Sequence, residues 1–400
     1  MTRELNWKNI LLINRIFFDD SFISVIEVLF FGQYLGLSFA DFSVIMGICL
    51  ILSLIAQYPT GFLSDNFGRK KMLIVGRTLE AFSILAMLLL PYCLKGDLFV
   101  PVLLIEGVRT VMTALASGNF EVLIFDMFKK ENLPEEQFAE KSVSYFSGGA
   151  ILSAIFGFIS TLLFSYLMLL PLLLDFLVKI LKLSFIIFIP SEVSIRKKEK
   201  KKAFMPLRYE KQILFIIVFF AILFSISRGS FSLYQPLMTD LGIPIYYYGF
   251  LIMMVNLAVF GLLRLVKERI RIFTLSKLFW ISFLTLTSQL IILSITLLEV
   301  TLARFIMIAI LLSSMQIIRL FSEGMSSYFI NQAIQGRGDK TTAFSLYSMV
   351  AQLLLSVTFF MMGIMEKWSN YYLLTYLYLC LLFSGLLLVF YLYGRRKKYA

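Results

Sequence analysis

The sequence predicts an all-α integral membrane protein with twelve transmembrane helices, arranged as two pseudo-symmetric six-helix bundles. Its 400 residues are 59% hydrophobic and only 16% charged, with a mean hydropathy of +0.86. Soluble domains contain roughly 45–50% apolar residues. Apolar stretches of about 20 residues, the length that crosses a bilayer, recur along the whole chain. Basic residues are also divided very unequally between alternate connections, as membrane topology requires.

Twelve stretches are long and apolar enough to be spans: 9–33, 40–62, 72–94, 99–125, 142–165, 167–190, 212–236, 244–265, 273–297, 300–324, 341–364 and 370–393. The first carries Arg15, Asp19, Asp20 and Glu27 and has no small-residue cleavage site, so it is expected to be a retained helix rather than a signal peptide. The fifth and sixth spans are joined only by residues 165–166.

Lys and Arg residues orient these spans. If the N-terminus is cytoplasmic, 27 of the 37 basic residues lie on inner segments or at the inner ends of spans, eight lie deeper within spans, and only Lys95 and Lys367 lie in outer loops. This is a strong positive-inside pattern, which predicts that both termini are cytoplasmic. The basic run 196–208 is then a cytoplasmic linker, and the predicted domains are 1–190, a linker at 191–211, and 212–400. An anchor near anionic lipid headgroups is a better interpretation of this run than a nucleic-acid site.

The residue inventory argues against an enzyme. Histidine is absent, which excludes His-based triads, His-ligated metals and His proton relays. Cys49, Cys93 and Cys380 all lie in apolar stretches, which does not indicate a disulfide framework or a metal cluster. No catalytic residue, metal or organic cofactor is therefore expected, and an integral membrane enzyme is the least favoured class.

Ionisable side chains within spans are costly in lipid, so each is expected to face the protein interior. Several have an opposite charge three or four residues away on the same helix face: Arg15–Asp19, Arg77–Glu80, Glu106–Arg109 and Asp175–Lys179. For most of them, an ion pair that stabilises the bundle interior is a sufficient explanation.

The polar stretch PTGFLSDNFGRKK at 59–71 resembles the signature of the major facilitator superfamily, G-x-L-x-D-x-x-G-R-[RK]-x, between the second and third helices. Gly61, Asp65, Gly68, Arg69 and Lys70 fall on the pattern. Gly61 allows close helix approach, and Gly68 permits a tight turn that a Cβ would oppose. In the family this loop is a latch that holds the two halves in one orientation.

A latch needs an acidic partner for Arg69. The stretch SGNFEVLIFDMFKK at 117–130 resembles an S-G-x-x-E-x-x-x-x-D run of some bacterial members, so Asp126, or with less support Glu121, is the expected acceptor. A partial copy of the signature follows the eighth span. There Gly261 and Arg269 lie 200 residues after Gly61 and Arg69, as an internal six-helix repeat predicts.

In this family the first, fourth, seventh and tenth helices line a central cavity. The resemblance therefore makes one proton or substrate cavity possible, formed by Asp20, Glu27, Glu106, Arg109 and Arg228. Because proton, substrate and guanidinium can compete for one carboxylate, Asp20 or Glu27 is the expected proton-binding group. Asp20 as a structural partner of Arg15 is the alternative.

The resemblance implies a secondary transporter of the cell membrane that works by alternating access, as a monomer in the lipid bilayer. Resemblance to bacterial drug-efflux-type members implies proton-driven export of a small hydrophobic or amphipathic compound, with the proton gradient as energy source. The fifth span, 142–165, has part of the antiporter glycine motif but lacks its proline. A symporter or facilitator for a small anionic metabolite is the alternative transport mode, and a non-transporting sensor or scaffold is the alternative class.

Overall fold

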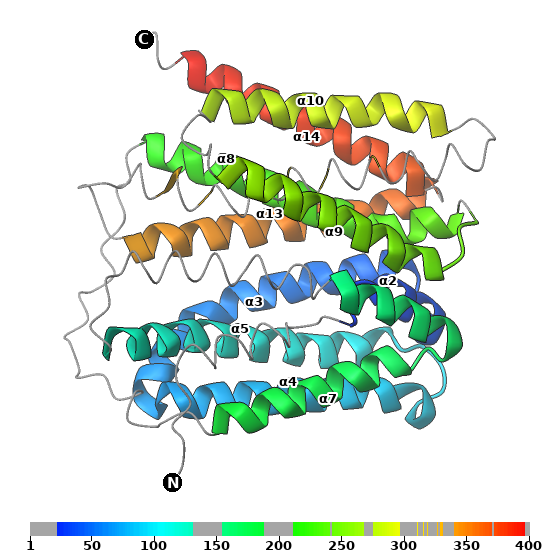
Figure 1. Ribbon diagram of the computed structural model, residues 1–400, viewed down its shortest axis with the longest axis vertical. Helices are drawn as coiled ribbons and strands as arrows, with labels where there is room; N and C mark the ends of the chain where they lie inside the picture. The colour runs from blue at the N-terminus through cyan, green and yellow to red at the C-terminus, as the bar shows by residue number, and fades with distance from the viewer. Residues whose placement is uncertain are drawn as a thin grey trace. The chain divides into compact units, whose positions relative to one another are not determined.

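The computed structural model shows a protein whose described regular elements are all helices (Figure 1). The structure describes residues 22–130, 154–187, 211–240, 242–267, 275–296, 310, 315, 318, 326, 329–330, 340–369 and 372–396. In this part of the chain the helices fall on the spans that hydropathy predicts, in keeping with the predicted all-α class. Lipid cannot satisfy backbone polar groups, so a spanning segment must bond them internally, as an α-helix does.

The elements before the predicted linker are α2 (Glu27–Leu29), η1 (Phe30–Tyr34), α3 (Phe39–Phe67), α4 (Arg69–Cys93), α5 (Phe99–Lys130), a helix over 154–166 and α7 (Leu170–Ile187). Those after it are α8 (Lys211–Asp240), α9 (Tyr246–Lys267), α10 (Leu275–Thr296), α13 (Lys340–Ser369) and α14 (Tyr372–Arg396). Within the described residues, five helices are long and apolar enough to cross a membrane, judged by length and composition.

The chain divides into two compact units. The first comprises 1–37 and 48–205, and the second comprises 38–47 and 206–400. The first residues of α3 thus belong with the second unit. Most of the predicted linker at 191–211 lies outside the described residues, so the domain boundaries proposed from the sequence stay a prediction.

In the first unit, α4 packs against both α5 and α7 (Figure 1). The contact between α4 and α5 is close because Gly76 has no side chain. A Cβ at this position would lie 2.9 Å from the backbone oxygen of Met112, nearer than real Cβ atoms approach. Gly157, on the helix over 154–166, similarly lies against Val25.

The described end of the first span is not a continuous α-helix. A turn over 22–26 leads into the single turn α2 and then into the π-helical turn η1. Polar side chains from distant segments bind the backbone here. The hydroxyl of Ser160 donates to the Phe22 carbonyl, and the Phe22 N–H donates to Asp175 Oδ1 at 3.4 Å. The Tyr34 hydroxyl also donates to the Leu88 carbonyl at 2.7 Å. These contacts support the irregular backbone that carries Glu27.

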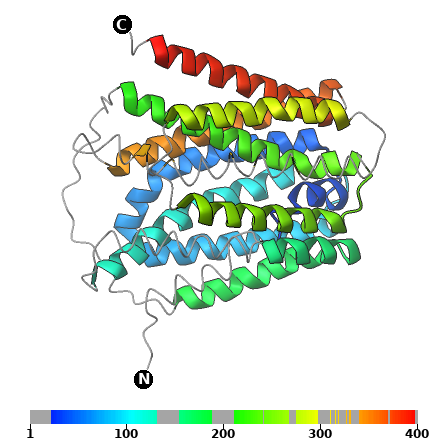
Figure 2. The ribbon, with the colours of Figure 1, turned by 45° about the horizontal axis from the view of Figure 1, so that its top comes forward.

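In the second unit, α8 packs against α13 and α14, and α10 packs against α14, as both ribbon views show (Figure 2). The first residues of α3 lie against α13. The Ser356 hydroxyl donates to the Gly47 carbonyl at 2.8 Å, and a Cβ at Gly363 would lie 3.2 Å from the Ala40 carbonyl oxygen. Small and hydroxyl-bearing residues therefore allow these helices to pack closely.

Candidate functional site

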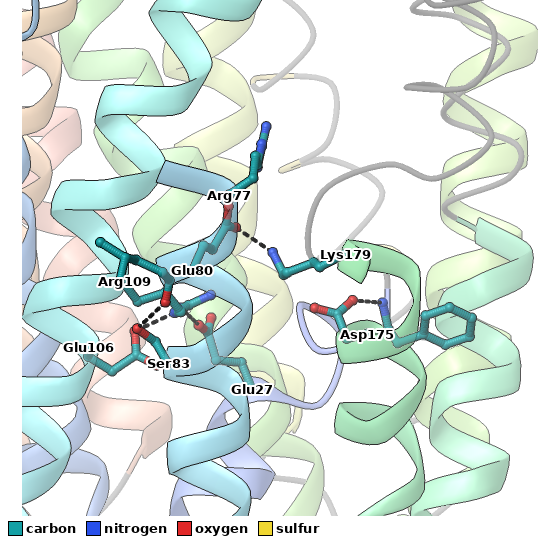
Figure 3. Close-up of polar contacts among 10 residues, drawn as sticks. Glu27, Arg77, Glu80, Ser83, Glu106, Arg109, Asp175 and Lys179 are labelled. Atoms are coloured by element: carbon teal, nitrogen blue, oxygen red, sulfur yellow. Dashed lines mark hydrogen bonds and ion pairs between the residues drawn. The ribbon is translucent and has the colours of Figure 1, made fainter. Parts of the chain in front are cut away.

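Three of the predicted cavity residues contact one another in the first unit (Figure 3). Glu106 and Arg109 lie one turn apart on α5, with Arg109 Nε 2.7 Å from Glu106 Oε2. Glu27, on α2, approaches the same guanidinium, with its Oε1 3.6 Å from Arg109 Nη2. We call Glu27, Glu106 and Arg109 the carboxylate–arginine cluster.

The two carboxylates of the cluster differ in burial. The side chain of Glu106 is 3% exposed and that of Arg109 is 10% exposed, whereas the side chain of Glu27 is 22% exposed. Two carboxylates therefore approach one guanidinium, from α2 and from α5. Glu27 is the more exposed of the two and lies farther from Arg109.

Cys49 is a neighbour of this cluster that the sequence did not indicate. It lies on α3, is 2% exposed, and lies within electrostatic reach of Glu106, Arg109 and Glu27. Its thiol also lies near the Thr110 side chain of α5. A single cysteine in an apolar stretch forms no motif in the sequence. Its position beside the cluster therefore follows only from the packing of α3 against α5.

A second buried network joins α4 to α7. Arg77 Nη1 lies 2.8 Å from Glu80 Oε2, which confirms the predicted pair on α4. The other carboxylate oxygen of Glu80 accepts a hydrogen bond from Lys179 of α7, a contact between helices that spacing along one helix could not predict. Lys182 and Asp175 on α7 are also buried. These contacts are consistent with the predicted stabilising role for such pairs.

Five of the predicted latch residues, Gly61, Asp65, Gly68, Arg69 and Lys70, lie at or near the junction of α3 and α4. Gly68 has φ of +89°, which L-residues rarely adopt, so a glycine is required at this junction. Arg69 is buried, and Lys70 Nζ donates to the Ile187 carbonyl at the end of α7 at 2.8 Å. The structure does not describe the side chains of the other latch residues. These are Gly61 and Asp65 in α3, and Glu121 and Asp126 in α5. The partner of Arg69 therefore stays a prediction.

Of the remaining two predicted cavity residues, one lies outside the described residues and the other belongs to the second unit. Asp20 lies outside the described residues. Arg228 lies on α8 in the second unit, where its side chain is exposed and its guanidinium carbon is 5.7 Å from the centroid of the Phe224 ring.

Comparison with known proteins gives a family match and a set of similar folds. The family model described as Major Facilitator Superfamily matches residues 13–357. A search of curated protein sequences gives no significant match.

Among solved structures, a mutant of the nucleoside transporter NupG is 10% identical, with a TM-score of 0.69, covering 96% of this chain and 98% of the other. A D-xylose–proton symporter is 13% identical, with a TM-score of 0.68 and coverages of 94% and 95%. A bacterial homologue of human drug peptide transporters is 14% identical, with a TM-score of 0.61 and coverages of 97% and 97%. At these identities the similarity concerns the fold.

Proposed function

Because the chain belongs to the major facilitator superfamily, a family of membrane transporters, we propose that it is a proton-coupled secondary active transporter of a small hydrophobic or amphipathic compound. It works by alternating access, in which two helical bundles rock about a central site. Its coupling ion is the proton, its direction is export by antiport, and its energy source is the proton gradient alone.

The observation that carries this proposal is the carboxylate–arginine cluster. Glu106 and Arg109 form a short, well-buried pair, whereas Glu27 is more exposed and farther from the guanidinium. Protonation of Glu27 removes one negative charge and weakens its attraction to Arg109, while the pair with Glu106 remains. Because α5 and the α2–η1 segment meet at this guanidinium, a proton on Glu27 changes how these two elements are held together.

Two further observations support the proposal. Glu27 lies three residues before the start of η1, and π-helical turns within helices are frequent at functional sites. One protein of similar fold is a D-xylose–proton symporter, in keeping with proton coupling in this fold. We further propose that the protein is a monomer in the cell membrane with both termini in the cytoplasm, from the distribution of its basic residues.

Symport or facilitated entry of a small anionic metabolite is the second candidate function. The exposed Arg228 of α8 favours it, because a guanidinium at membrane depth selects for anions. The direction of proton movement separates the two candidates. Antiport acidifies the compartment that the substrate leaves, whereas symport makes it more alkaline.

The test uses purified protein in sealed vesicles with an internal pH indicator. Addition of a substrate from a panel of amphipathic cations, anions and neutral compounds should move protons in the wild type. Glu27→Gln, which mimics the protonated carboxyl group, should reduce substrate-dependent proton movement at least about tenfold while passive substrate exchange continues. Asp97→Asn is the matched control, because Asp97 is exposed and its asparagine replacement still accepts the Phe99 N–H that Asp97 binds at 2.9 Å. Proton movement by Glu27→Gln at the wild-type rate would contradict the role of this residue, and no proton movement with any compound would contradict proton coupling itself.

A further inference from the structure

The first turns of α3 pack closely against the last turns of α13, within the second unit. The Ser356 hydroxyl donates to the Gly47 carbonyl at 2.8 Å, and a Cβ at Gly363 would lie 3.2 Å from the Ala40 carbonyl oxygen. Residue 40 therefore lies beside 363 and residue 47 beside 356, so the two helices run in opposite directions. We call this packing the α3–α13 contact.

Two carboxylates lie at one end of the α3–α13 contact. Asp41 follows Ala40 in the first turn of α3, and Glu366 follows Gly363 by three residues, which is nearly one helical turn. Both side chains are half-buried, and Glu366 lies within electrostatic reach of Asp41. The Asp41 carboxylate also accepts the Ser38 hydroxyl at 2.6 Å and the Ser38 N–H at 3.1 Å, which fixes it at the start of α3. The packing of α3 on α13 thus brings two groups of like charge together.

Ionisable groups from the other two helices that pack on α13 lie at the same end. Asp240 is the last residue of α8, and Tyr372 is the first residue of α14. Tyr372 lies within electrostatic reach of both Glu366 and Asp240. Lys367, which follows Glu366 on α13, is exposed. These described groups comprise three carboxylates, one phenol and one cation, so acidic groups outnumber basic ones around Glu366.

The surroundings of Glu366 favour its protonated form. Glu366 and Asp240 lie beyond the ends of the predicted spans 341–364 and 212–236. Partial burial and then the Asp41 carboxylate raise the pKa of Glu366, and Lys367 opposes this shift. Partial burial also raises the pKa of Asp240. A carboxyl group with a raised pKa stabilises the packed state when the pH is below its ordinary pKa, and this stabilisation is lost as the pH rises through the raised pKa.

We infer that Asp41 and Glu366 make the α3–α13 contact sensitive to pH. When Glu366 is ionised, the two carboxylates repel each other and weaken the contact. When Glu366 is protonated, this repulsion disappears and the contact tightens. Residues 365–369 form a predicted outer connection, so the pH of the outer compartment sets the strength of the contact. The inference goes beyond the proposed function, because it depends neither on the transported compound nor on Glu27.

The sensitivity would act on a helix that both units share. Residues 38–47 of α3 belong to the second unit, and α3 enters the first unit at residue 48. In the first unit, Cys49 of α3 lies within electrostatic reach of the carboxylate–arginine cluster. The helix that the outer pH holds against α13 is therefore the one that continues to this cluster.

The test measures hydrogen exchange of the backbone amides of residues 38–47 in purified wild-type protein and in Glu366→Gln. Each comparison is made at one pH, so that the intrinsic pH dependence of exchange cancels. At about pH 8 the wild type should exchange at least about threefold faster, because its carboxylate repels Asp41 and the neutral Gln does not. As the pH falls to about 5, the ratio of the two rates should fall toward one, because Glu366 takes up a proton.

Three further variants show whether charge is the cause. Glu366→Asp keeps the carboxyl group and should retain the pH-dependent ratio, even if Glu366→Gln proves unstable. In Asp41→Asn, adding Glu366→Gln should change exchange at about pH 8 much less than it does in the wild type, because the repelling partner is already neutral. Asp97→Asn is the control, since this exposed carboxylate belongs to the first unit and its loss should leave exchange of residues 38–47 unchanged.

Two outcomes would overturn the inference. The first is a ratio that does not vary with pH, whether it equals one or not, because Glu366 would then have no role or a purely structural one. The second is slower exchange in the wild type than in Glu366→Gln at about pH 8, because the ionised carboxylate would then strengthen the contact. Neither outcome bears on proton coupling, which the vesicle assay of Glu27→Gln tests separately.

Discussion

Gly76 illustrates how a single residue determines the packing of the first unit. Any side chain here meets the backbone oxygen of Met112, 2.9 Å from the position of a Cβ, and backbone cannot move aside as a flexible side chain can. We predict that Gly76→Ala lowers the free energy of unfolding by about 1–3 kcal/mol, the usual cost of overpacking. Thermal unfolding of the purified protein in detergent measures the change.

Gly261 provides the matched control for this substitution. It also lies within a helix, α9, but a Cβ there would meet nothing within 4 Å. Gly261→Ala should therefore be neutral or stabilise the protein, by up to about 1 kcal/mol from helix propensity. If both alanine variants melted at the same temperature, the close α4–α5 contact would not be the reason for Gly76.

Residues of the candidate site differ in how far the sequence could predict them. Glu106 and Arg109 are three apart on a regular helix, so their contact follows from helix geometry alone. The contact of Arg109 with Glu27 depends on how α5 packs against the irregular α2–η1 segment, which no spacing describes. The sequence could suggest these three residues as a cluster only through the resemblance to a family with a known cavity.

At the scale of elements, hydropathy predicts where the helices lie but not where they become irregular. The stretch 22–34 is as apolar as its neighbours, yet it contains a turn and a π-helical turn. The reason is remote in the sequence, because Asp175 and Ser160, more than 130 residues away, bind the backbone of Phe22. Local hydropathy cannot carry information about such partners.

The α4–α7 contact depends on a buried charge network. Glu80 is fully buried and accepts hydrogen bonds from Arg77 on its own helix and Lys179 on α7. If one partner is removed, the remaining charges stay buried without enough opposite charge to balance them, which typically costs about 3–5 kcal/mol. We predict that Lys179→Met lowers the free energy of unfolding by an amount in this range, measured by thermal unfolding in detergent.

A double-mutant cycle with Glu80→Gln tests whether the two residues act together. Once Glu80 is neutral, Lys179→Met should cost at least about 1 kcal/mol less than it does in the wild type, because interacting residues are not additive. Ser184→Ala is the control on α7, since the Ser184 hydroxyl only donates to backbone carbonyls of its own helix. Strictly additive losses would contradict a direct link between α4 and α7.

At the scale of the whole molecule, the unequal distribution of basic residues agrees with the family to which the chain belongs. Of the basic residues in the connections or at the ends of the predicted spans, 27 are predicted to lie on one side of the membrane and two on the other. Such a ratio orients every span at once, because the chain alternates sides with each crossing. The twelve spans and the basic linker are predictions from the sequence alone, whereas the assignment of residues 38–47 to the second unit requires the packing of α3 against α13.

The distribution of basic residues also predicts which side of the membrane each connection faces, and the native cysteines provide a way to test it. Cys93, at the end of α4, is exposed and adjoins a predicted outer loop, whereas Cys49 and Cys380 are buried. A membrane-impermeant maleimide should therefore label intact cells that make the wild-type protein, and Cys93→Ser should abolish the labelling. Adding Ser194→Cys, at the edge of the predicted linker, to Cys93→Ser should restore labelling only after the cells are permeabilised. Labelling of Ser194→Cys in intact cells would place the linker outside, and with it reverse the orientation on which the proposed direction of transport depends.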